Sequence, residues 1–189
     1  SRRTRRMHGG HHGSPQLFFI SPFPIPYFPF PIHSFCDLYT MGTIELTTGK
    51  ELIIHSHIIT YGDAADPAIT ARIREEIETM WNEPKSTIFL DHIIFSVRFN
   101  ITGDCLPNIA QEDILGNTNP GNNYFRIEEF AIDNISFVDG LGCNTGYFKL
   151  ENLYPGSTTA AHEYGHTLGL NHPTDLDLRG KGVPGIMYP

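Results

Sequence analysis

The segment 162–172, with the sequence HEYGHTLGLNH, restricts what this chain can fold into more than any other part of it. It predicts a helix over residues 157–170, because a spacing of four places His162 and His166 on one helix face about a turn apart. Two imidazole rings in this arrangement can bind one tetrahedral Zn²⁺. The segment therefore predicts a metal site on a helix.

A third histidine, His172, lies too far along the chain to reach the same metal if the helix continues. Gly169 predicts a turn here, since glycine adopts a left-handed backbone at low cost and often ends a helix. Pro173 cannot continue a helix either. We expect His172 to return as a third ligand, which leaves a fourth position open for water or a substrate carbonyl.

Glu163 lies one step further round the predicted helix than the first histidine. From there its carboxylate can reach a metal-bound water without being a ligand, so its expected role is general base and then general acid. A second short segment, residues 185–189 with the sequence GIMYP, follows the last histidine.

Together the two segments resemble the zinc-binding helix and the Met-turn of the metzincin metallopeptidases. Within that clan, the Met-Tyr-Pro ending and the glycine at position 165 are most similar to the matrixin branch. The specific resemblance covers residues 157–189. It implies a secreted or extracellular zinc-dependent endopeptidase that binds protein or peptide substrates in extended conformation along an edge strand. The implied roles are zinc ligand for His162, His166 and His172, catalytic residue for Glu163, and apolar floor beneath the imidazoles for Met187.

The chain also departs from that family pattern. Residues 174–182 lengthen the connection to the Met-turn, and Tyr188 directly follows Met187, so the role of a movable tyrosine ligand is not carried over. The sequence ends at Pro189, directly after the Met-turn, so we expect either a truncated C-terminal subdomain or a fragment of a longer chain. The resemblance, together with the order of the predicted elements, implies that residues 138–147 form the substrate-binding rim.

The expected fold class is α+β, similar to a metzincin catalytic domain: a twisted, mostly parallel sheet with a backing helix and an active-site helix. Asp66 can cap the backing helix, and Pro67 suits its first position. The pattern predicts helices over 67–82 and 157–170, a loop over 103–123, and strands over 43–48, 51–60, 86–90, 92–101, 124–131, 134–138 and 145–151.

The catalytic domain is expected to span residues 40–189, preceded by an extension over residues 1–39. The extension is first basic and rich in glycine and histidine, and then rich in proline and aromatic residues. It is either a linker on the domain surface or a pro-segment that covers the cleft. As a pro-segment it would place Cys36 or Asp37 in the open metal position.

Two alternative functions therefore stay open beside the peptidase. One is a latent zymogen blocked by the N-terminal segment, and the other is a non-catalytic, zinc-stabilised module that binds extended peptides. Glu163 favours catalysis, because a purely structural zinc site does not require it.

The charge of the main domain argues against nucleic acid as its partner. The formal net charge is −8, and four of the 13 basic residues lie within residues 1–6, so the remainder carries 9 basic and 21 acidic residues, or −12. No apolar run is long enough to span a bilayer, and residues 17–32 contain too many prolines for a signal-peptide core. The oligomeric state cannot be read from the sequence.

Cysteines and further charged residues suggest additional sites. The chain has 3 cysteines, of which Cys105 and Cys143 lie in loop-like stretches and could pair; the alternative is unpaired thiols. His55 and His57 share one strand face and could bind a second metal. Structural calcium could use the predicted 103–123 loop, with Asp104, Glu112, Asp113 or the asparagines of the loop as oxygen ligands, although no ordered calcium motif is present.

Overall fold

A curved, mostly parallel seven-stranded sheet organises the part of the chain that the computed structural model describes, residues 42–131, 134–174 and 185–188. The strands are β1 (Thr43–Leu46), β2 (Glu51–Tyr61), β3 (Thr87–Leu90), β4 (Ile93–Cys105), β5 (Asn122–Glu128), β6 (Phe137–Val138) and β7 (Thr145–Lys149). The helices are α1 (Pro67–Asn82), α2 (Gln111–Leu115), the 3₁₀ helix η1 (Leu150–Asn152) and α3 (Thr159–Thr167). The expectation of a mixed class with a mostly parallel sheet is confirmed.

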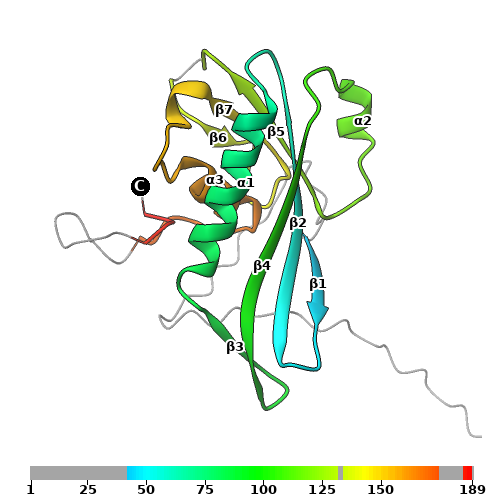
Figure 1. Cartoon of the computed structure of the whole chain (residues 1–189), viewed down its shortest axis with the longest axis vertical. Coiled ribbons are helices and arrows are strands. Elements are labelled where there is room, and N and C mark those ends of the chain that lie inside the picture. The colour runs from blue at the N-terminus through cyan, green and yellow to red at the C-terminus, as the bar shows by residue number, and fades with distance from the viewer. Residues whose placement is uncertain (1–41, 132–133, 175–184, 189) are drawn as a thin grey trace, which may run out of the picture.

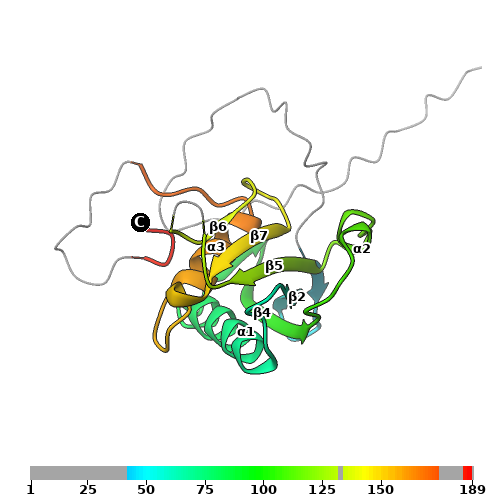
Figure 2. The same cartoon turned by 90° about the horizontal axis from the view of Figure 1, so that it is seen from above.

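The strand order is β3-β4-β2-β5-β7-β6, and β1 pairs with the first half of β2. The pairs β2–β4, β2–β5 and β5–β7 are parallel, whereas β3 and β6 add antiparallel edges. Helices α1 and α3 lie on the same, concave side of this sheet (Figures 1 and 2). The sheet therefore forms a wall behind both helices.

Helix α1 has the bounds that the sequence predicts. Asp66 accepts a hydrogen bond from the backbone N–H of Ile69 at 2.8 Å, and Pro67 occupies the first turn. Ile73 and Ile77 are fully buried against the sheet and α3. A side-chain cap and an apolar stripe at helical spacing together explain why this helix forms here.

The prediction of a loop over 103–123 is wrong in two places, because this segment contains the end of a strand and a short helix. Strand β4 continues to Cys105, which pairs with Thr60 of β2, and Gly103 allows the two backbones to approach closely. Helix α2 then forms over Gln111–Leu115, with two acidic side chains in its first turn, where they interact favourably with the helix dipole. The glycines, prolines and asparagines of this segment are typical of turns, so the sequence pattern did not indicate either the strand or the helix.

The predicted Cys105–Cys143 disulfide is also wrong, because Cys105 carries a free thiol. Cys105, at the end of β4, is level with Gly146 of β7, and β2 and β5 lie between these two strands. Three strand spacings separate them by about 14 Å. Cys143 precedes β7, so the strands with which the two cysteines are associated are not neighbours in the sheet.

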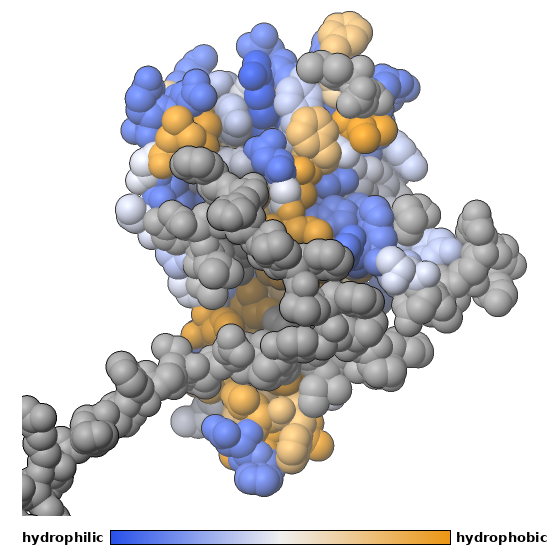
Figure 3. Space-filling model, turned by 180° about the vertical axis from the view of Figure 1, so that it is seen from behind, coloured by the Kyte–Doolittle hydropathy of each residue, from blue (hydrophilic) through white to orange (hydrophobic). Residues whose placement is uncertain are grey.

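Apolar side chains are exposed at one end of the sheet, where the β1–β2 and β3–β4 hairpins lie. This end is the lower part of Figure 3, where apolar surface gathers. The exposed large hydrophobic residues of these strands are Ile44, Leu46, Phe89, Ile93 and Ile94.

Several sequence-based expectations concern residues outside the described ranges. These are the extension over residues 1–39, the suggested latency ligands Cys36 and Asp37, most of the connection 174–182, and Pro189. Within the described ranges, no helix has both the length and the apolar character that crossing a membrane requires.

Candidate metal centre

Helix α3 carries the first two histidines and ends earlier than the sequence predicts, at Thr167. Gly169 has a φ of +82°, the left-handed conformation expected of it. The N–H of Gly169 donates to the carbonyl of His166 at 3.0 Å, and the N–H of Leu170 donates to the carbonyl of Gly165 at 3.1 Å. This turn reverses the chain, and His172 returns towards the helix.

The three histidines converge through their Nε2 atoms. Nε2 of His172 lies 2.9 Å from Nε2 of His162 and 3.1 Å from Nε2 of His166. Among the described residues, this is the one group of three or more His, Cys, Asp or Glu side chains that is compact enough to hold a metal ion.

Backbone carbonyls fix the orientation of the two helical imidazoles. Nδ1 of His162 donates to the carbonyl oxygen of Ile186 at 2.8 Å, and Nδ1 of His166 donates to that of Leu170 at 2.7 Å. A carbonyl can only accept, so in the neutral rings the proton sits on Nδ1 and the Nε2 lone pair is left unprotonated. Metal-binding histidines in proteins are typically held by such an outer hydrogen bond.

The donor set fits Zn²⁺. Three imidazole nitrogens at about 2.0–2.1 Å from a tetrahedral Zn²⁺ would lie about 3.3 Å apart, close to the two Nε2 separations observed. Burial lowers the pKa of His162 and of His172, and the neighbouring imidazoles lower it further. Both shifts favour the neutral ring, which is the form that binds a metal.

Glu163 is 9% exposed, and its carboxylate is not part of the compact histidine group. Burial raises the pKa of this carboxyl from 4.5 to about 7, and a hydrogen bond from the backbone N–H of Val138 opposes the rise. Asp139 donates its N–H to the carbonyl of Thr145, so the backbone groups of Val138 point away from β7, towards the edge of β6 that pairs with no further strand of the described residues.

The segment 185–188 packs against α3 and contributes more than the carbonyl of Ile186. A Cβ atom added at Gly165 would overlap the sulfur of Met187, and it would come within 2.9 Å of Cζ2 of Trp81. Glycine at this position therefore gives Met187 and Trp81 room to contact the backbone of the metal-binding helix.

Sequence reasoning missed residues that contact α3 from outside the histidine segment. Glu76 and Trp81 of α1 bind the backbone of Ala161, and Val138 binds Glu163. Trp81 lies at the end of the apolar stripe that predicted α1, whereas Glu76 sits among other charged residues and gives no signal. Val138, Leu170 and Ile186 act through backbone groups, which carry no residue-specific pattern.

Of the other suggested metal ligands, His55, His57 and Asp104 have protein partners instead. His55 hydrogen-bonds to Glu45 at 3.0 Å and to Asn100 at 2.9 Å. His57 hydrogen-bonds to Thr102 at 2.7 Å and lies 3.3 Å from Asp104. The remaining calcium candidates, Glu112 and Asp113, are exposed on α2.

No protein-family model matches this chain, and no curated protein matches it either.

Proposed function

We propose that this chain is a zinc-dependent endopeptidase of the metzincin type. The convergence of three Nε2 atoms, two of them on rings whose Nδ1 atoms donate to backbone carbonyls, carries the proposal. His162, His166 and His172 would hold the ion, and Glu163 would be the catalytic residue. Bound Zn²⁺ would supply a Lewis acid that polarises the substrate carbonyl and lowers the pKa of water.

The chain itself supplies the proton transfers. Glu163, as a carboxylate, accepts a proton from the attacking water and then donates it to the leaving amine when the peptide bond breaks. In the metal-free chain, burial raises the pKa of Glu163, and such desolvation makes its carboxylate a stronger base than an exposed carboxylate would be.

The edge strand β6 supports the substrate class. Its outward backbone groups can pair with an extended peptide in the manner of strand addition. Since the N–H of Val138 already binds Glu163, its carbonyl is the group left to accept a hydrogen bond from the substrate backbone beside the catalytic acid. An extended protein segment or peptide meets these requirements.

A non-catalytic module that binds peptides at the same edge is the second candidate. The edge of β6 beside Glu163, which no other strand of the described residues pairs with, favours it as much as it favours the peptidase. The buried carboxyl of Glu163 separates the two, because burial of an ionisable group destabilises the fold and a binding module gains nothing from it.

The test compares zinc-loaded wild type with Glu163→Gln on a denatured protein and on a quenched peptide library. We expect wild type to cleave, a chelator to abolish cleavage, and Glu163→Gln to lose about 10²–10⁴-fold in rate while binding zinc one to one. Glu129→Gln, an exposed carboxyl outside the site, should retain wild-type activity.

Each negative result has its own meaning. One-to-one zinc binding without cleavage by wild type would replace the active peptidase with the latent zymogen or the binding module, and deletion of residues 1–40 would separate these two. Absence of zinc binding would refute the metal centre itself.

A further inference from the structure

Helix α3 does not cap its own N-terminus. Its N-cap residue, Thr158, makes no side-chain capping bond and has φ −117° and ψ 6°, outside the extended conformation that a capping side chain normally needs. The N–H groups of the first turn therefore have no acceptor within the helix. One of them belongs to Ala161, which immediately precedes His162.

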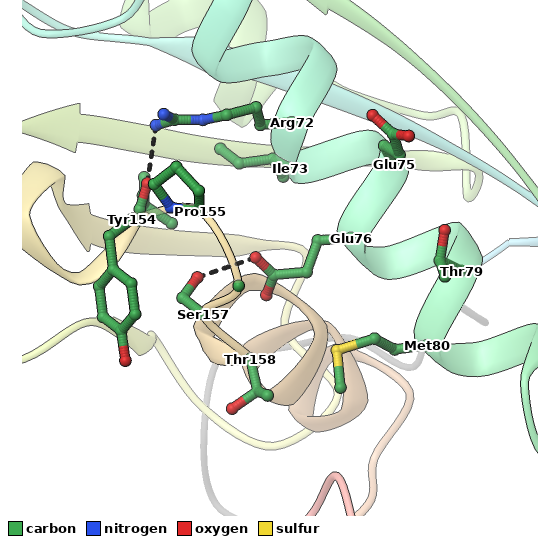
Figure 4. A pocket seen from close by; sticks show the side chains of 12 residues that line it. Arg72, Ile73, Glu75, Glu76, Thr79, Met80, Tyr154, Pro155, Ser157 and Thr158 are labelled. Atoms are coloured by element: carbon green, nitrogen blue, oxygen red, sulfur yellow. Dashed lines mark hydrogen bonds between the residues drawn. The ribbon is translucent and has the colours of Figure 1, made fainter.

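Helix α1 supplies the missing acceptor. One carboxylate oxygen of Glu76 accepts from the N–H of Ala161 at 3.1 Å, and the other accepts from the hydroxyl of Ser157 at 2.9 Å. Figure 4 shows Glu76 reaching from α1 to the segment that leads into α3. The carboxylate of Glu76, a residue of another helix, thus accepts the hydrogen bond that an N-cap side chain would normally accept.

The opposite polar group of Ala161 is also bound by α1. The indole N–H of Trp81 donates to the carbonyl of Ala161 at 3.0 Å, and the ring packs edge-on against Tyr164 with centroids 6.1 Å apart. Both backbone polar groups of the residue before His162 therefore bind side chains of α1. This pair of contacts fixes where α3 begins and how far it is rotated about its axis.

Helix α1 is itself fixed to the sheet, so it can serve as a reference. The side chain of Asn82 donates to the carbonyl of Phe99 and accepts from its N–H, both at 2.9 Å. The position of the first metal ligand is thereby tied to β4 through α1.

We propose that Glu76 is a positioning residue of the metal centre. It holds the first turn of α3 so that the ring of His162 meets the other two histidines and the carbonyl of Ile186. This inference rests on the proposed function. The cavity of about 390 Å³ beside Glu76 is not assigned to a ligand, because both carboxylate oxygens already accept hydrogen bonds from the protein.

The test uses Glu76→Ala, Glu76→Gln and the matched control Glu75→Ala, an exposed glutamate next in the chain on the same helix. For each protein, Zn²⁺ affinity is measured by competition with a chelator, and the Co²⁺ complex is characterised by its visible absorption spectrum. Hydrogen exchange of the Ala161 amide is measured in metal-free protein.

We expect Glu76→Ala to weaken Zn²⁺ binding about 10–100-fold, the usual effect of removing a group that orients a ligand. The Co²⁺ spectrum should change, and the Ala161 amide should exchange faster. Glu76→Gln should stay near wild type, since its amide oxygen can accept from Ala161 and its amide nitrogen can donate to Ser157. Glu75→Ala should match wild type.

Wild-type metal affinity and spectrum in Glu76→Ala would overturn the proposal, as would a Glu76→Gln variant as impaired as Glu76→Ala. Trp81→Phe, which removes the bond to the Ala161 carbonyl and keeps an aromatic ring, should weaken Zn²⁺ binding in the same direction; it decides the matter if Glu76→Ala does not fold. If wild type binds no metal, the proposed function fails, and the exchange of Ala161 still tests the contact.

Discussion

Replacement of Gly165 by alanine tests the packing beneath the metal-binding helix. Gly165 lies inside α3, where alanine would by itself favour the helix by about 1 kcal/mol. The new methyl group would overlap the sulfur of Met187, and it would lie 3.0 Å from its Cε and 2.9 Å from Cζ2 of Trp81. The sulfur would have to retreat by about 1.5 Å to reach an ordinary contact distance.

The gain in helix propensity can be compared with the cost of the overlap with Met187 and Trp81. Forcing an extra methyl into a packed site costs about 1–3 kcal/mol, which exceeds the gain in helix propensity. We therefore expect Gly165→Ala to destabilise metal-free protein by about 1–2 kcal/mol, or by about 2–8 °C in Tm. Displacement of Met187 should also pull the carbonyl of Ile186 away from His162 and weaken Zn²⁺ binding about 10–100-fold.

The assay is urea unfolding of metal-free protein together with chelator competition for Zn²⁺. Gly185→Ala is the matched control, because a Cβ there meets no atom within 4 Å, and it should leave both quantities unchanged. The double variant Gly165→Ala/Met187→Ala should recover part of the stability, since it removes the overlapping sulfur. A Gly165→Ala variant that is more stable than wild type, with unaltered Zn²⁺ affinity, would refute this reasoning.

Three further predictions use the same unfolding assay. In metal-free protein, the pKa of Glu163 is about 7, above its unfolded value of 4.5, so the folded state loses stability as the pH rises from about 4.5 to about 7. The free energy of unfolding of wild type relative to Glu163→Gln should therefore decline over this pH range, and a constant difference would contradict the burial argument. Asp66→Ala should cost about 0.5–2 kcal/mol by uncapping α1, and a smaller loss would show that the cap is dispensable. Tyr164→Phe should cost about 1–3 kcal/mol because it leaves the buried hydroxyl of Ser56 without its 2.7 Å partner, and restoration by Ser56→Ala would identify that bond as the cause.

Local patterns predicted the elements that local forces determine. Helix α1 combines a cap, a proline and an apolar stripe, and its predicted bounds agree with the structure. The left-handed turn at Gly169 follows from glycine chemistry alone. The extension of β4 to Cys105 depends instead on pairing with β2, which no window of sequence contains.

In the candidate site, too, features set by local sequence could be predicted, and features set by long-range contacts could not. The spacing of His162 and His166 predicted a shared helix face because helix geometry is regular. The contact of Glu76 with Ala161 joins residues 85 positions apart, and the carbonyl of Ile186 reaches His162 across 24. Such contacts depend on the packed fold, so only the structure could reveal them.

The strand order also has a consequence for the kinetics of folding. The central strand β2 pairs in parallel with β4 and β5, which follow it only after long intervening segments, and such non-local pairing makes folding slow. The turn with His172 and the segment 185–188 pack on a helix that needs this sheet behind it. Interactions that form after the rate-limiting step act on unfolding alone. Bound metal would therefore prolong the lifetime of the folded chain and leave its rate of folding unchanged.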